Sequence, residues 1–177
     1  MGSLRACTLC PRRCGVDRVA GGRGFCRAGA GGVEVYRYAP HHGEEPVLSC
    51  DGGSGTVFFG RCTLACTYCQ NYPWSQPAGV SGGRVYDTRG LAGILRELYD
   101  AGCANWNLVS PTPWLPWIAD AVRSERASGV SLPVVYNTSG YERTEILAAY
   151  ADVWDIFLPD LRYASNETAR RYSGCRD

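Results

Sequence analysis

The segment TVFFGRCTLACTYCQNY occupies residues 56–72, and its first five residues, TVFFG, form a short apolar run. A run of this length predicts a buried strand. Further strands are predicted at 106–109, 133–136 and 155–158, and helices at 88–101, 114–128, 144–150 and 166–172. Strands that alternate with helices predict an α/β fold with a parallel sheet and right-handed crossovers. In such a sheet functional residues gather at the carboxyl ends of the strands, and here a cysteine-rich loop directly follows the first strand.

The chain before residue 56 differs in composition from the rest. Residues 1–32 are rich in Cys, Gly and Arg and show little periodicity, which predicts a small segment held together by metal. Residues 33–55 are expected to form a connector that includes a strand at 33–39. Residues 56–177 are expected to form the α/β core.

Composition excludes several classes of partner. The 177 residues carry a formal net charge of +1, and 45% of them are hydrophobic. This balance predicts a globular protein without a general attraction to nucleic acid or to acidic membranes. The apolar runs are too short to cross a bilayer, and the first ten residues do not resemble a secretory signal. We therefore expect a cytoplasmic protein with neither nucleic-acid nor membrane partners.

Ten cysteines are many for a cytosolic chain, and they indicate metal or redox chemistry more than disulfides. Three of them, Cys62, Cys66 and Cys69, follow the first predicted strand with the spacing C-x3-C-x2-C. Three thiolates can hold three irons of a [4Fe-4S] cluster and leave the fourth iron open to a small molecule. The alternative is a structural zinc site or unliganded thiols, although zinc usually takes four Cys or His ligands in paired spacing.

Four further cysteines lie close together near the N-terminus: Cys7, Cys10, Cys14 and Cys26. Four thiolates suit a closed tetrahedral zinc site or an auxiliary iron–sulfur cluster, and the sequence does not decide between the two metals. Neighbouring arginines could compensate the negative charge of such a site. The alternative is free thiols in a disordered tail.

The central segment resembles the signature of the radical S-adenosylmethionine (SAM) superfamily, C-x3-C-x-aromatic-C, in which Tyr68 supplies the aromatic residue. The resemblance implies a [4Fe-4S] cluster on the three central cysteines, with SAM bound to its open iron. It also implies an electron donor such as flavodoxin or ferredoxin. The implied activity is that of an enzyme that cleaves SAM reductively to methionine and a 5′-deoxyadenosyl radical, and the implied fold is a partial (β/α) barrel.

The chain is also similar to one branch of this superfamily, the proteins related to the activating enzyme of pyruvate formate-lyase. The matching segments are CTLCPRRCGVDR at 7–18, GEEPVLS at 43–49, GSGTVFF at 53–59, CQNY at 69–72, NLV at 107–109, VYNTSGY at 135–141 and LPDLRY at 158–163. This likeness implies activation of a glycyl radical enzyme or modification of another protein substrate, without fixing the substrate.

The same resemblance assigns contacts with SAM to residues at the ends of later strands, while catalytic residues stay unassigned. The implied contacts are Pro111, Thr112, Asn137, Thr138, Asp160 and Arg162, and Tyr68 of the cysteine loop is a further implied cofactor-binding residue. Each has a structural alternative. Asn137 and Thr138 could simply turn the chain or cap the helix that follows. Asp160 and Arg162, two apart on an extended segment, could form a surface ion pair.

Several features depart from this branch. Cys50 stands where the branch usually has Gly, Pro113 where it has His, and Arg162 where it has Lys. The superfamily core has six βα units, whereas about four are predicted here, so the barrel is expected to be truncated. Two alternatives therefore stay open: an iron–sulfur electron carrier, and a non-catalytic metal-binding protein that uses zinc in the N-terminal cysteines.

Overall fold

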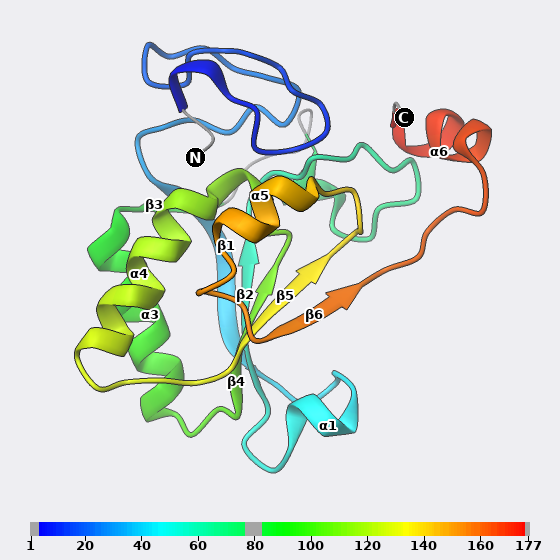
Figure 1. Ribbon diagram of the computed structural model, residues 1–177. Coiled ribbons are helices and arrows are strands. Elements are labelled where there is room, and N and C mark those ends of the chain that lie inside the picture. The colour runs from blue at the N-terminus through cyan, green and yellow to red at the C-terminus, as the bar shows by residue number, and fades with distance from the viewer. Residues whose placement is uncertain (1–3, 77–82, 176–177) are drawn as a thin grey trace.

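The computed structural model describes residues 4–76 and 83–175, which adopt an α/β fold built on a six-stranded mixed sheet (Figure 1). The strand order is β3-β1-β2-β4-β5-β6. The strands are β1 (Val33–His41), β2 (Ser54–Phe59), β3 (Arg84–Tyr86), β4 (Asn105–Val109), β5 (Val134–Thr138) and β6 (Ile156–Pro159). Strands β2, β4, β5 and β6 run parallel, and β1 pairs antiparallel with both β2 and β3.

Helices follow the parallel strands in the order expected for βα units. The helices and helical turns are η1 (Leu4–Ala6), α1 (Pro46–Ser49), α2 (Tyr72–Ser75), α3 (Thr88–Asp100), η2 (Thr112–Trp114), α4 (Leu115–Ala127), α5 (Thr144–Ala149) and α6 (Asn166–Ser173). Asp87 caps α3 by accepting a hydrogen bond from the Gly90 N–H at 2.7 Å, which satisfies a donor that the helix leaves free. The strands and longer helices predicted from sequence are thus confirmed. Among the described helices, none combines the length and apolar character that a membrane span requires.

The sheet differs from the prediction in two ways. The strand predicted at 33–39 extends to His41 and lies antiparallel beside β2, so the sheet is mixed instead of wholly parallel. Sequence periodicity also does not predict β3, because Arg84 and Val85 are exposed and the strand has only three residues. Within the described residues the sheet is open, with β3 at one edge and β6 at the other.

The two faces of the sheet differ in polarity, because alternate residues of a strand point to opposite sides. One set packs into the main core with the apolar side chains of α3 and α4: Val57, Phe59, Trp106, Leu108, Val134 and Tyr136. The opposite set is buried but polar: Ser54, Thr56, Asn105 and Asn107. The Asn107 amide donates to the Glu44 carboxylate at 2.8 Å, so the segment that leads into α1 lies against the polar face.

Residues 4–32 lie across the carboxyl ends of the parallel strands, above the sheet in Figure 1. Leu9 and Ala28 of this segment are buried in the main core. The Arg143 guanidinium at the start of α5 donates to the carbonyl of Thr8. The N-terminal cysteines are therefore held next to the edge of the sheet where the central cysteine loop begins.

Candidate metal and cofactor sites

The central cysteine loop begins with a sharp change of chain direction at the end of β2. Arg61 has a φ of 68°, in the left-handed region, and its N–H donates to the Trp74 carbonyl at 2.8 Å. Its side chain forms a largely buried ion pair with Glu34 of β1 at 2.8 Å. These contacts direct Cys62 away from the strand and over the edge of the sheet.

Each sulfur atom of the central cysteines has a polar hydrogen-bonding group close to it. The pairs are the Leu64 N–H and Cys62 Sγ at 3.4 Å, the Ser173 hydroxyl and Cys66 Sγ at 2.8 Å, and the Ser75 hydroxyl and Cys69 Sγ at 3.2 Å. Donors aimed at sulfur stabilise thiolates and tune the potential of a cluster. Ser173 belongs to the end of α6, so the tertiary fold brings it to the loop.

The pKa of the Cys62 thiol is raised to about 11, mostly by burial and to a smaller extent by the neighbouring Cys66 and Cys69. The Leu64 N–H and the Ser110 hydroxyl act in the opposite direction. Ser110 directly follows β4 and has a φ of 57°, a conformation that is uncommon outside glycine. Three thiolates in this position repel one another, and a bound metal cation would remove that repulsion.

The four N-terminal cysteines, Cys7, Cys10, Cys14 and Cys26, line one small cavity of about 20 Å³ together with Arg12 and Arg18. Backbone hydrogen bonds close the segment around it: the Cys7 N–H donates to the Val16 carbonyl at 2.9 Å, and the Gly15 N–H to the Cys7 carbonyl at 2.9 Å. Burial raises the pKa of Cys10 to about 12, and the other three cysteines add to the rise. The four thiols therefore line one cavity, and their binding of a metal stays a prediction.

A buried arginine lies beside these thiols. Arg18 is only 2% exposed, and its guanidinium donates to the Pro113 carbonyl at 2.8 Å and lies 4.0 Å from Cys7 Sγ. It also donates twice to the Gly29 carbonyl. A buried charge needs a counter-charge, and a metal bound by four thiolates carries net negative charge. Arg18 therefore fits a metal–thiolate centre better than four neutral thiols.

The cysteines of each group are neighbours without forming a finished coordination sphere. Among residues 4–76 and 83–175, no three Cys, His, Asp or Glu side chains are positioned to hold a metal ion. The donor sets nevertheless fit, because thiolates are the ligands that iron–sulfur clusters and structural zinc prefer. Polar groups at the central sulfurs and a guanidinium at the N-terminal ones favour anionic sulfur in both places. Binding requires the sulfur atoms of each group to converge.

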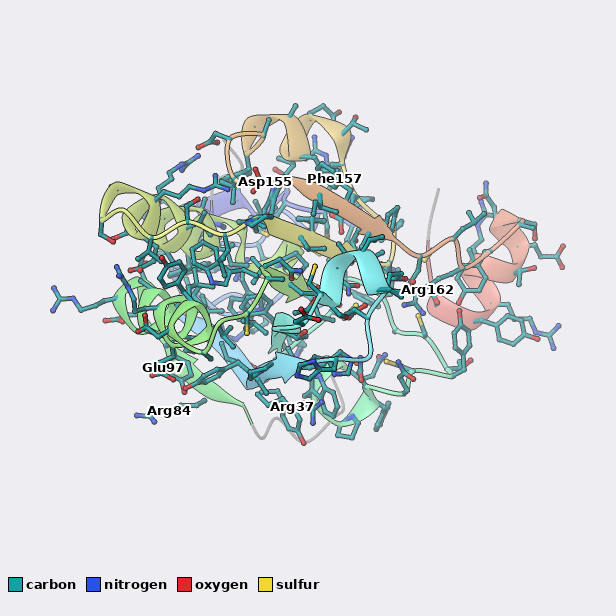
Figure 2. The ribbon with its side chains drawn as sticks, turned by 90° about the horizontal axis from the view of Figure 1, so that it is seen from below. Arg37, Arg84, Glu97, Asp155, Phe157 and Arg162 are labelled. Atoms are coloured by element: carbon teal, nitrogen blue, oxygen red, sulfur yellow. The ribbon has the colours of Figure 1, made fainter. Side chains whose placement is uncertain are left out.

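Three of the residues proposed for SAM lie together beside the central loop. Tyr68, Asp160 and Arg162 line a cavity of about 750 Å³ that also reaches Cys69. The Arg162 guanidinium pairs with the Asp160 carboxylate, as the structural alternative for this pair predicts. Figure 2 shows Arg162 beyond the end of β6, on the side facing α6. The Tyr68 hydroxyl donates to that of Tyr163 at 2.6 Å.

The residues proposed at the ends of β4 and β5 do not line this cavity. The hydroxyls of Thr112 and Thr138 each donate to Glu142 Oε1 at 2.6 Å, and Thr112 lies 3.0 Å from the Tyr136 hydroxyl. Burial raises the pKa of Glu142, while its hydroxyl donors lower it. These threonines therefore hold two loops together around a half-buried carboxylate.

The two remaining residues proposed at these strand ends, Pro111 and Asn137, accept hydrogen bonds from backbone N–H groups within the fold. The Pro111 carbonyl accepts from the Trp114 N–H at 2.9 Å, which starts η2. Asn137 lies half-buried on β5, and its carbonyl accepts from the Ser110 N–H at 2.9 Å. The structure thus brings together the residues proposed after β2 and β6, and leaves those after β4 and β5 engaged within the fold.

Two departures from the resembling branch have local explanations. Cys50 has a φ of 44°, a conformation that favours glycine, which is the residue that the branch usually has at this position. Its exposed thiol lies at the end of α1 and belongs to neither cysteine group. Pro113 keeps a structural contact, because its carbonyl accepts the hydrogen bond from Arg18.

Sequence reasoning missed several supporting residues. They are Ser75, Ser110, Glu142, Tyr163 and Ser173, whereas Arg12 and Arg18 are among the neighbouring arginines expected to compensate thiolate charge. Serines and tyrosines carry no spacing signal when their partners lie many residues away. Tyr163 falls inside the segment LPDLRY at 158–163, which matches the resembling branch, and that position was the one available signal.

Comparison with known proteins finds one distant relative of uncharacterized function. No family model matches the chain. It is 30% identical to the uncharacterized protein MJ0674 of Methanocaldococcus jannaschii, over an alignment covering 96% of this chain and 49% of that protein. The chain therefore spans about half the length of this curated relative.

Proposed function

We propose that this chain is a radical SAM protein that holds a [4Fe-4S] cluster on Cys62, Cys66 and Cys69 and cleaves SAM reductively. The observation that carries the proposal is the position of these thiols. They follow the first parallel strand directly, lie close to polar hydrogen-bonding groups, and adjoin a cavity lined by Asp160 and Arg162 from the end of β6. When bound, the cluster would supply one electron to SAM and a coordination site for its amino and carboxylate groups.

The chain's own residues would bind and orient SAM. The Arg162 guanidinium can take the SAM carboxylate, because its fork of N–H donors matches carboxylate geometry. The Asp160 carboxylate can accept hydrogen bonds from ribose hydroxyls once Arg162 turns to the ligand. Tyr68 is half exposed at the mouth of the cavity and offers a ring surface beside it. The donors on Cys62 and Cys66 would disperse negative charge on the sulfurs.

The four-unit sheet corresponds, in this proposal, to part of a radical SAM (β/α) barrel. Its exposed edge strand β6 leaves Phe157 half exposed, and Leu161 just beyond it is almost fully exposed. An electron donor such as flavodoxin or ferredoxin, and a protein substrate of the glycyl-radical-enzyme kind, complete the proposed reaction. The N-terminal cysteines would hold zinc or a second iron–sulfur cluster.

A second candidate is a non-catalytic metal-binding protein. The observation that favours it is the contact of Glu142 with Thr112 and Thr138, since two residues expected at SAM are satisfied within the fold. In this case metal would bind both cysteine groups without any reaction of SAM.

The test is anaerobic reconstitution with iron and sulfide, followed by reduction with dithionite and an assay for 5′-deoxyadenosine from SAM. We expect product from the wild type and none from the variant with Cys62, Cys66 and Cys69 replaced by Ala. Cys50→Ala is the matched control, because this cysteine is exposed and belongs to neither group. Full iron loading without 5′-deoxyadenosine would favour the second candidate, and product from the triple variant would reject the proposed cluster site.

A further inference from the structure

One arginine of the N-terminal segment touches both cysteine groups. Arg12 lies between Cys10 and Cys14 in sequence and lines the same cavity as the four N-terminal cysteines. Its backbone N–H donates to Cys10 Sγ, which lowers the pKa of that thiol against the effect of burial. Its guanidinium lies 3.5 Å over the ring of Phe25, whose own N–H points at Cys14 Sγ at 3.4 Å. The conformation of the N-terminal segment therefore fixes where this guanidinium can be.

The far end of the same side chain binds the central loop. Arg12 Nε donates to the Thr63 carbonyl at 3.0 Å, and Thr63 directly follows Cys62. The two terminal nitrogens donate to the carbonyls of Ser173, at 3.2 Å, and Gly174. A guanidinium carries its donors on three separate nitrogen atoms and can therefore reach carbonyls of two segments at once, whereas a lysine ammonium has all its donors on a single nitrogen.

The end of α6 is itself tied to the cysteine loop. The Ala65 N–H donates to the Ser173 carbonyl at 3.3 Å, and the Thr67 N–H donates to the Tyr172 carbonyl at 2.8 Å. The Ser173 hydroxyl donates to Cys66 Sγ. Arg12 thus binds both the central cysteine loop, at Thr63, and the end of α6, where Ser173 supplies a hydrogen bond to Cys66 Sγ.

From this geometry we infer that Arg12 is a positioning residue that couples the two groups: metal bound by the N-terminal cysteines orders the central cysteine loop through Arg12. The inference rests on the proposed function, because it requires the N-terminal cysteines to bind metal. Residues 4–32 bury few apolar side chains, so their fold depends on that metal. Metal loss releases the guanidinium, so the loop loses its hydrogen bond at Thr63 and the end of α6, which is tied to the loop, loses two more. By linkage the effect is reciprocal, with a typical coupling of about 5- to 150-fold.

Hydrogen exchange measures this coupling without any cluster on the central cysteines. One equivalent of Zn²⁺ is added to the full chain, and exchange of the peptide covering 61–70 is compared with and without the metal. We expect Zn²⁺ to slow exchange of this peptide at least about fivefold in the wild type. In Arg12→Gln and Arg12→Lys the same Zn²⁺ should change it less than about twofold. A residue that only stabilised the fold would alter exchange equally with and without zinc.

Two controls make the outcomes distinct. Arg13→Gln changes the next, exposed arginine and should keep the full zinc effect. A variant with Cys7 and Cys26 replaced by Ser should lose both Zn²⁺ binding and protection of 61–70.

Failure of the wild type to bind Zn²⁺ would reject the N-terminal metal site and the coupling with it. Binding with equal protection in Arg12→Gln would overturn the coupling alone. If both Arg12 variants unfold, lack of zinc-dependent protection in the wild type would still overturn it.

Discussion

The two cysteine groups differ in where their supporting residues come from. The N-terminal group takes its four thiols and both of its arginines from residues 4–32, and it encloses a cavity of about 20 Å³. The central group has three thiols, and the serines that contact its sulfurs include Ser110, directly after β4, and Ser173 of α6. It opens beside a cavity of about 750 Å³. A closed set of local ligands suits a structural centre, and an incomplete set beside a large cavity suits a centre that meets a small molecule.

The largest expected effect separates the two groups by their contribution to folding. Replacing Cys10 and Cys26 with Ser should make cleavage within residues 4–32 by a protease roughly a hundredfold faster, because a structural metal supplies most of the stability of such a segment. Replacing the three central cysteines with Ala should leave this segment protected. Limited proteolysis of metal-loaded full-length protein measures both rates, and equal rates in the two variants would contradict the comparison.

The next effect concerns the hydroxyl that donates to Cys66. In Ser173→Ala the proposed cluster would lose a hydrogen bond of about 1 kcal/mol, which equals about 40 mV for a one-electron couple. Because the bond is stronger to the more negative, reduced cluster than to the oxidised one, the midpoint potential should fall by up to that amount. Redox titration followed by electron paramagnetic resonance measures the shift. Ser165→Ala is the control, since it removes the cap of the same helix but touches no sulfur. An equal shift in both variants would show that helix fraying, and not the hydrogen bond, sets the potential.

A smaller effect tests the half-buried carboxylate that lies between the loops after β4 and β5. Burial raises the pKa of Glu142 above its usual value of 4.5, so the folded state binds this proton more tightly than the unfolded state. The resulting stability is present below about pH 4.5 and is lost as the pH rises through the folded pKa. Glu142→Gln should therefore flatten that fall in the free energy of unfolding, measured by urea unfolding between pH 4 and about 7.

The control for this measurement is Glu145→Gln, which changes an exposed carboxylate in the first turn of α5. It should keep the pH dependence of the wild type. A slope that persists unchanged in Glu142→Gln would show that another group carries the proton.

The smallest effect uses a cysteine outside both groups. Cys50→Gly removes a side chain from a residue with a φ of 44°, which relieves backbone strain of about 1 kcal/mol and costs part of that gain in unfolded-state entropy. We expect the free energy of unfolding to rise by about 0.5 kcal/mol, with no change in metal content. Thermal unfolding and metal analysis of the same samples check both points, and a loss of metal would place Cys50 among the ligands.

Much of the fold could be predicted from the sequence because its signals are local. The apolar run at 56–60, the helical spacing of Leu91, Ile94, Leu95 and Leu98, and the glycines that end helices depend on neighbouring residues alone. The direction of β1 could not be predicted, because strand pairing depends on the path of the chain between β1 and β2. The short edge strand β3 lacks the buried side chains that give a strand its pattern.

By itself the sequence determined the two cysteine groups, the order of the βα units and the placement of the central group after the first parallel strand, because ligand spacing and hydrophobic periodicity are written in consecutive residues. Only the tertiary structure decided which residues serve those groups. Arg12 donates to the Thr63 carbonyl, and the Ser173 hydroxyl donates to Cys66 Sγ. Glu142 accepts hydrogen bonds from Thr112 and Thr138. Hydrogen bonds between segments far apart in the chain depend on packing, and packing leaves no regular spacing in a sequence.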